Sequence, residues 1–199
     1  MPGKADVAKR FLLWTALYFI GAVLASRYLR NADGVTLFWP AAGIGYVCAL
    51  RYGLRWIEEP IWPAEDVDSL GRLRKATGVP LAAGENATGA LEFVRLAAAG
   101  IDYLQPSAVK NGLTAQWDIC RRAEQDGATC VPHSPYFGPG LLATLHLLAL
   151  RDDGLVEMFY LKREACLWGG RADVDSTGHV AVPTGAGLGL EPDRGVMER

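Results

Sequence analysis

The sequence predicts an α/β fold in which the strands of a parallel sheet alternate with helices. Three observations predict it: short apolar runs recur about 25 residues apart, amphipathic segments separate them, and glycines follow these segments. Gly78, Gly100 and Gly127 stand where a left-handed helix C-cap is favoured. The expected strands are Leu54–Glu58, Pro80–Gly84, Tyr103–Pro106, Thr129–Pro132 and Val156–Leu161. The expected helices are Ala64–Thr77, Ala87–Ala99, Thr114–Asp126 and Gly138–Leu150.

The composition is that of a folded chain without a basic, nucleic-acid-binding surface. Of the 199 residues 50% are hydrophobic and the formal net charge is -2 at pH 7, which excludes intrinsic disorder. The near balance of acidic and basic residues argues against nucleic acid as a partner. The cysteines (Cys48, Cys120, Cys130 and Cys166) lie far apart without a CxxC pair, so we expect reduced, mostly buried thiols and no zinc site.

Two uncharged apolar segments precede the strand–helix repeat. They cover residues 11–26 and 34–50, and a short turn containing Arg27 and Arg30 joins them. Each is close to the lower length limit for a membrane span, about 17 residues, and basic residues flank the pair more densely than they occupy the turn. This pattern predicts a membrane hairpin with both ends in the cytoplasm. Two buried helices and a cleaved signal peptide are the alternatives.

Polar side chains accompany the ends of the expected strands. Glu58 ends the first strand, Glu85, Ser107 and His133 follow the next three, and Glu157 lies within the last. Because the carboxyl ends of parallel strands meet at one edge, we expect these side chains to face one mouth. Paired carboxylates suit Mg²⁺, and a histidine can transfer a proton. The residues indicate a metal-assisted reaction on an oxygenated small molecule; the alternative is that each is a solvated or structural loop residue.

Five short motifs whose amino-acid sequences are typical of one protein family follow one another along the chain. They are W-I-E-E-P (56–60), P-A-E-D (63–66), P-L-A-A-G-E-N (80–86), Q-P-S-A-V-K-N-G (105–112) and V-P-H-S (131–134), and the tail G-H-V-A-V-P-T-G-A-G-L-G-L-E-P-D (178–193) follows them. In this order they resemble the enolase superfamily, specifically the barrel domain of the mandelate racemase and muconate-lactonising enzyme group, over residues 54–199. The resemblance implies a partial (β/α)8, TIM-type barrel holding about the last five strands.

The resemblance also implies a chemistry and assigns four residues to it. The family abstracts the proton α to a carboxylate and stabilises the enediolate on Mg²⁺. Glu58 and Glu85 match two of the three metal ligands, and His133 resembles the general acid/base of the racemase and sugar-acid dehydratase branch. Glu157 resembles the group that hydrogen-bonds the substrate carboxylate. The plan is physically sound, since a divalent cation lowers the pKa of the α-proton and a positioned side chain moves it.

The chain departs from the family pattern in two places. The Lys-x-Lys base and the first metal-binding Asp have no counterpart, and the apolar residues 11–50 stand where they should lie. At the sixth strand end Ser107 replaces an orienting Asp or a catalytic Lys, which leaves His133 without an evident carboxylate partner. Lys110 matches a family lysine just beyond this position, with a structural role as the alternative. We expect impaired turnover, and open strand edges that pairing into a homo-oligomer would close.

The expected organisation is a fusion of two parts, residues 1–53 as a membrane hairpin and residues 54–199 as a truncated barrel domain. Residues 11–55 resemble, through W-P-A-A-G-I at 39–44, part of the membrane-associated sensor (MASE-type) domain of bacterial signalling proteins. We expect the barrel part on the cytoplasmic side of a membrane, with a cytoplasmic protein as the alternative. The expected function is a Mg²⁺-dependent enzyme of sugar-acid dehydratase type acting on a hydroxy acid or acid sugar. A membrane-anchored, non-catalytic scaffold and a non-functional fusion are the alternatives.

Overall fold

The computed structural model describes residues 55–151, 154–158 and 164–198, together with residues 13, 16 and 20. The chain divides into two compact units, Met1–Leu81 and Ala82–Arg199, each of which is described by itself. The expected hairpin of residues 11–50 falls outside the described residues except Leu13, Ala16 and Ile20, which are helical. Within the described part of the chain, no helix combines the length and the apolar character needed to cross a membrane.

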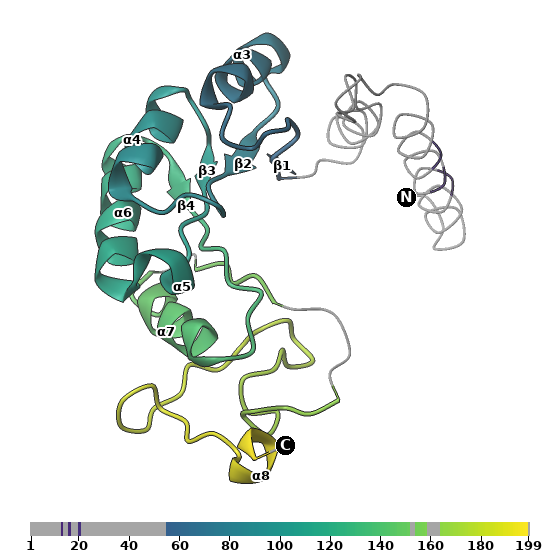
Figure 1. Ribbon diagram of the computed structural model, residues 1–199, viewed down its shortest axis with the longest axis vertical. Coiled ribbons are helices and arrows are strands. Elements are labelled where there is room, and N and C mark those ends of the chain that lie inside the picture. The colour runs from purple at the N-terminus through teal and green to yellow at the C-terminus, as the bar shows by residue number, and fades with distance from the viewer. Residues whose placement is uncertain are drawn as a thin grey trace. The chain divides into compact units, whose positions relative to one another are not determined.

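Strands and helices alternate along the chain, which confirms the predicted α/β class (Figure 1). The sheet has the order β1–β2–β3–β4, and β2, β3 and β4 run parallel. The strands are β1 (Ile57–Glu58), β2 (Leu81–Ala83), β3 (Tyr103–Leu104) and β4 (Thr129–Cys130). The helices are α3 (Val67–Thr77), α4 (Ala90–Ala98), α5 (Ala108–Asn111), α6 (Leu113–Gln125), α7 (Pro139–Leu148) and α8 (Arg194–Met197).

Four of the five expected strands are confirmed, each shorter than predicted. The prediction of a strand at Val156–Leu161 is wrong for residues 156–158, which lie in no strand, and residues 159–161 fall outside the described part. Helices α5 and α8 were not predicted because each has only 4 residues, too few to show a periodic pattern. Gly78, Gly100 and Gly127 all adopt positive φ, as their positions after helices predicted.

In the first unit, helix α3 has conventional caps at both ends. Asp66 accepts a hydrogen bond from the Ser69 backbone N–H at 3.0 Å, and Gly78 ends the helix in the left-handed region with φ 68. Leu70 is its fully buried side chain, and strand β1 is joined to the residue before β2 by a hydrogen bond from Ile57 N–H to Pro80 O at 2.9 Å.

In the second unit, an apolar layer lies between the strands and two helices. Helices α4 and α6 contact one another and lie on the same side of β3 and β4 (Figure 1). The strand residues Ala82, Ala83 and Leu104 are at most 1% exposed, and Phe93 from α4 and Ile119 from α6 pack into the same buried layer. The polar side chains of the site lie beyond this layer, after the carboxyl ends of the strands.

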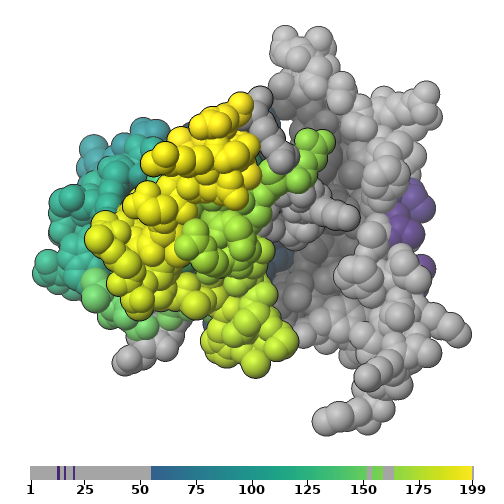
Figure 2. Space-filling view, turned by 90° about the horizontal axis from the view of Figure 1, so that it is seen from below, coloured from purple at the N-terminus to yellow at the C-terminus, as the bar shows by residue number. Residues whose placement is uncertain are grey.

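The C-terminal segment, residues 164–198, packs on helix α7 with little regular structure. Trp168 and Ala172 join Leu141, Leu142 and Leu145 of α7 in one buried cluster. His146 of α7 contacts the Leu188 carbonyl at 3.1 Å, so the far end of the segment is also tied to this helix. Figure 2 shows the segment, from lime to yellow, as a continuous surface on this face of the unit.

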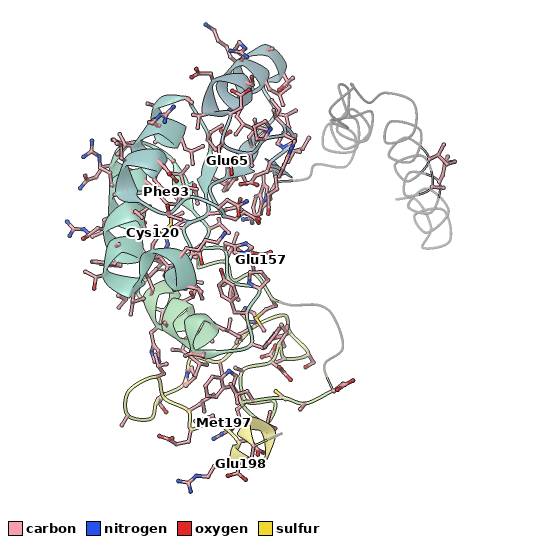
Figure 3. The ribbon with its side chains drawn as sticks, in the orientation of Figure 1. Glu65, Phe93, Cys120, Glu157, Met197 and Glu198 are labelled. Carbon is pink, nitrogen blue, oxygen red and sulfur yellow. A yellow bond between two sulfur atoms is a disulfide. The ribbon has the colours of Figure 1, made fainter. Side chains whose placement is uncertain are left out.

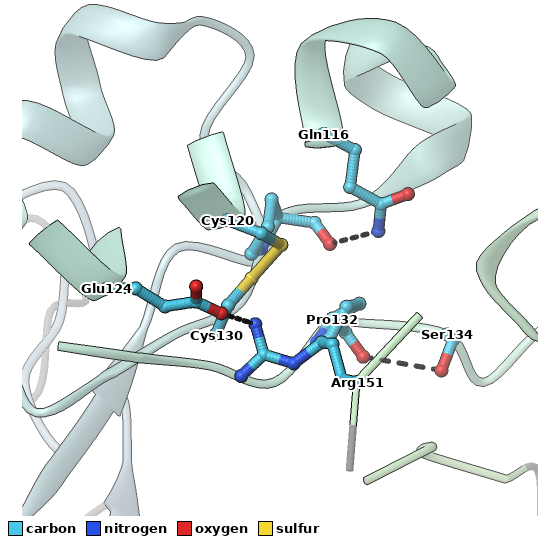
Figure 4. The surroundings of a disulfide bond; sticks show 8 residues. Gln116, Cys120, Glu124, Cys130, Pro132, Ser134 and Arg151 are labelled. Atoms are coloured by element: carbon cyan, nitrogen blue, oxygen red, sulfur yellow. Dashed lines mark hydrogen bonds and ion pairs between the residues drawn. A yellow bond between two sulfur atoms is a disulfide. The ribbon is translucent and has the colours of Figure 1, made fainter. Parts of the chain in front are cut away.

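The expectation of reduced cysteines is wrong for two of them. Cys120 of α6 and Cys130 of β4 form a disulfide with a Cα–Cα distance of 5.2 Å (Figure 4). The residues are 10 positions apart with no recognisable spacing, and only the packing of α6 on β4 brings them together. The expected burial is confirmed for both, and Cys166 is free and half-buried.

Candidate active site

Glu85 follows the end of strand β2 because Gly84 permits a turn there. Gly84 has φ +112, and a Cβ at this position would lie 2.7 Å from a ring carbon of Phe93. A side chain is therefore excluded both by the backbone conformation and by the packing of α4 against the strand. The turn leaves the Glu85 carboxylate partly exposed, at 29%, beyond the apolar layer.

Lys110 ties the loop that carries Glu85 to helix α5. Its Nζ donates to the Glu85 carbonyl at 2.7 Å and to Asn86 Oδ1 at 2.8 Å. Helix α5 itself begins at Ser107, whose hydroxyl accepts a hydrogen bond from the Lys110 N–H. These contacts favour the structural role of Lys110: it holds the loop after β2 against the element that follows β3.

His133 lies between two carboxylates. Its Nδ1 is 3.0 Å from Glu157 Oε2 and 3.3 Å from Glu85 Oε2, and its side chain is only 15% exposed. The expectation that His133 lacks a carboxylate partner, drawn from Ser107 at the sixth strand end, is therefore wrong. The partners come from the loop after β2 and from residues 154–158; the sequence placed all three side chains at one edge of the sheet but did not pair them. Glu157 lies on the opposite side of the strands from α6 (Figure 3).

The carboxylates set the charge of this cluster. Burial of the imidazole lowers the pKa of His133, but the Glu157 and Glu85 carboxylates outweigh burial and the opposing Lys110 charge, so the pKa lies above its usual 6.5. The His133 side chain in turn holds the pKa of Glu157 below 4.5, against the effect of burial. The two residues thus favour an imidazolium–carboxylate pair over their neutral forms.

Tyr136 and Ser107 form a second contact layer beside His133. The Tyr136 ring meets the imidazole edge to face, with ring centroids 5.6 Å apart and planes at 84°. Its hydroxyl is 2.5 Å from Ser107 Oγ, and Ser107 is fully buried. Sequence reasoning missed Tyr136; the only available signal was its place three residues after His133 in a Pro-rich turn.

The two expected metal ligands, Glu58 and Glu85, belong to different units of the chain. Glu58 ends β1 in the first unit, is exposed, and is described within that unit alone, so its pairing with Glu85 stays a prediction. Among the residues that the structure describes, no three His, Cys, Asp or Glu side chains converge as metal ligands. Glu85 still has the character Mg²⁺ requires, a hard and accessible oxygen donor, although His133 engages one of its oxygens.

Comparison with known families and proteins identifies the fold. The family described as Enolase C-terminal domain-like matches residues 33–196. A D-galactarolactone cycloisomerase of Agrobacterium fabrum (strain C58) is 29% identical, and the match covers 75% of this chain and 42% of that protein.

Solved structures also resemble this chain in fold. The 3,6-anhydro-D-galactonate cycloisomerase of Zobellia galactanivorans superposes with a TM-score of 0.67 at 28% identity, covering 82% of this chain and 47% of that one. A mandelate racemase/muconate lactonizing protein of Paracoccus denitrificans PD1222, complexed with magnesium, has a TM-score of 0.65 at 25% identity, covering 78% and 43%. This chain spans less than half the length of each of these relatives.

These matches correct one resemblance drawn from the sequence. The family match begins at residue 33 and so includes the W-P-A-A-G-I stretch at 39–44. The resemblance of residues 11–55 to a membrane-associated sensor domain is not supported, and neither are the transmembrane hairpin and the membrane location that the apolar segments predicted. The domain boundary at residues 53 and 54 and the pairing with a second copy stay predictions.

Proposed function

The chain belongs to the enolase C-terminal domain-like family, and from this premise we propose that it removes the proton α to the carboxylate of an acid sugar or its lactone, with His133 as the base. The observation that carries the proposal is the contact of His133 Nδ1 with two carboxylates, at 3.0 and 3.3 Å. Relatives that act on galactarolactone and anhydrogalactonate support the substrate class.

The carboxylates decide which imidazole nitrogen can act. A proton on Nδ1 is stabilised by Glu157 and Glu85, so in the neutral ring the lone pair lies on Nε2. Nε2 is then the atom that takes the α-proton, and the imidazolium formed is stabilised by the same two carboxylates. Glu157 in this proposal orients the base, in addition to the contact with substrate that the family resemblance implies.

One base suits an elimination better than a racemisation. After the α C–H bond breaks, the electron pair forms the enediolate, and its collapse expels the oxygen substituent on the β-carbon, which takes the proton back from the His133 imidazolium. Racemisation instead needs a second acid/base group on the opposite face of the α-carbon. Glu58 and Glu85 would hold Mg²⁺, which when bound would stabilise negative charge on the substrate carboxylate.

Exchange of the α-proton tests the proposal directly. Acid sugars and their lactones are incubated with the chain and Mg²⁺ in D₂O, and loss of the α-proton signal is followed by ¹H NMR. We expect His133→Asn to slow exchange about 10²–10⁴-fold. His179→Asn, at an exposed histidine hydrogen-bonded to Thr177, is the matched control and should keep the wild-type rate. Equal rates in the wild type and His133→Asn would reject His133 as the base.

The products separate the two kinds of elimination. A product lighter by one water indicates a dehydratase, whereas a product of unchanged mass indicates a cycloisomerase that opens an internal C–O bond. Mass spectrometry of the same reaction mixtures makes this distinction. Mg²⁺ titration calorimetry, with Glu85→Gln as the control, tests the metal separately from turnover.

A further inference from the structure

Ser134 is a fully buried serine that the proposed reaction does not use. It directly follows His133, after strand β4, and none of its side chain is exposed. A buried hydroxyl costs free energy unless hydrogen bonds satisfy it, so its partners indicate what it contributes to the fold.

The hydroxyl and the backbone N–H of Ser134 are both directed at Glu157. The Glu157 backbone N–H donates to Ser134 Oγ at 3.1 Å, and the Ser134 backbone N–H donates to Glu157 Oε2 at 3.3 Å. The hydroxyl has one proton to give, and the Glu157 carbonyl at 3.0 Å is nearer than the Pro132 carbonyl at 3.3 Å. A single residue thus contacts the N–H, the C=O and the carboxylate of Glu157.

The contacts to the N–H and C=O of Glu157 use the backbone groups that a neighbouring strand would pair in a sheet. Residues 154–158 lie in no strand, so no β-ladder holds Glu157 beside the segment that follows β4. The carboxylate nevertheless lies 3.0 Å from His133 Nδ1, close enough for its negative charge to favour a proton on that nitrogen. Because Ser134 is the immediate neighbour of His133, it ties both members of the pair to one short stretch of backbone.

We propose that Ser134 is a positioning residue that presents the Glu157 carboxylate to His133 by replacing a β-ladder with hydrogen bonds from its hydroxyl and its N–H. The role rests on the proposed function only in that the His133–Glu157 pair serves the reaction. The hydrogen bonds and their effect on His133 are measurable without substrate or metal.

The variant Ser134→Ala removes the hydroxyl and keeps the backbone N–H. Its matched control is Ser107→Ala, because Ser107 is equally buried but its hydroxyl contacts Tyr136 and the Lys110 N–H instead of Glu157. Amide hydrogen exchange read by ¹H–¹⁵N NMR should be about 5- to 10-fold faster at Glu157 in Ser134→Ala, as loss of one hydrogen bond implies. Ser107→Ala should leave the Glu157 amide at the wild-type rate.

The second readout is the ¹⁵N chemical shift of His133 Nδ1 at one fixed pH in the metal-free chain, assigned with His133→Asn. Glu157→Gln defines the shift of a ring without its partner. We expect Ser134→Ala to move the His133 signal most of the way to that value, whereas a merely structural serine would lower thermal stability and leave the signal in place.

Three results would overturn the proposal. One is a wild-type His133 signal in a folded Ser134→Ala. Another is no effect of Glu157→Gln, since Ser134 would then have no pair to position. The third is an unprotected Glu157 amide in the wild type, which needs no variant and so decides the matter even where Ser134→Ala fails to fold. Failure of the α-proton exchange with normal NMR results would reject the proposed function alone.

Discussion

The strand–helix layer and the C-terminal segment of the second unit are stabilised by different interactions. In the layer, parallel strands pair by register, Ala82 with Tyr103 and Leu104 with Cys130, and a disulfide joins α6 to β4. Residues 164–198 contribute one four-residue helix and one isolated bridge, and they are held by Trp168 and by hydrogen bonds from side chains to carbonyls. The site takes one carboxylate from the end of a strand of the layer and the other from residues 154–158, which lie in no strand, and the two are held by different interactions.

This difference shows that a segment without the backbone hydrogen bonds of a sheet is held in place by a small number of side-chain contacts. Glu85 is placed by the end of a strand and by a glycine turn, whereas Glu157 is placed by Ser134. Loss of a single contact should therefore be local in the layer and far-reaching in the segment.

The largest effect is expected from Trp168→Ala. Trp168 is 4% exposed and joins the segment to the leucine cluster of α7. Truncation should reduce the free energy of unfolding by about 3–5 kcal/mol, through lost apolar burial and the cavity left behind. Urea unfolding followed by circular dichroism measures it.

The control for that variant is Trp62→Ala, because Trp62 is 80% exposed. Its change should stay within about 0.5 kcal/mol. Comparable losses in the two variants would contradict the view that Trp168 anchors the segment.

A smaller effect is expected at the strand end, from Gly84→Ala. The positive φ and the 2.7 Å approach to the Phe93 ring should together cost about 1–3 kcal/mol. Gly89→Ala is the matched change, since a Cβ there meets nothing within 4 Å. Thermal unfolding of both variants checks the difference. Equal stability of the two would mean that the Phe93 ring moves aside and that the turn does not require glycine.

The smallest effect is the pH dependence contributed by the His133–Glu157 pair. The pKa of His133 is raised in the fold, so its contribution is present below about 6.5 and is lost as pH rises through the folded value. The pKa of Glu157 is lowered, so its contribution is present above about 4.5 and is lost as pH falls through the folded value. Both side chains are partly exposed, and solvent screening limits the pair to about 1 kcal/mol or less.

Urea unfolding of the wild type and His133→Gln as a function of pH measures this contribution. The stability difference should be largest between about pH 4.5 and 6.5 and should shrink on both sides. Glu85 and Lys110 face the same imidazole with opposite effects, so Lys110→Met should extend the upper limit to higher pH. A difference that grows above pH 8 would contradict the pair.

Much of the fold was predictable because burial imposes a period on the sequence. The runs around Leu81, Leu104 and Cys130 read as strands since both faces of a parallel sheet are covered, and the amphipathic stretches between them read as α4 and α6. Glu85 and His133 were found for the same reason: residues after parallel strands share one edge. The prediction failed at residues 156–158, which lie in no strand; there the backbone N–H and C=O of Glu157 bond the Ser134 hydroxyl instead of a neighbouring strand.

The sequence by itself determined the class of fold, the order of most elements, and the family, because apolar periodicity and motif wording are local properties of the chain. Only the tertiary structure decided which groups meet: Glu157 with His133, Ser134 with Glu157, and Cys120 with Cys130. The physical reason is that these pairs form between segments that are separated along the chain, and the sequence pattern brings segments to one edge of the sheet without specifying which side chains meet there. The nearer carboxylate partner of His133 is Glu157, and the folded chain supplies it from residues that lie in no strand.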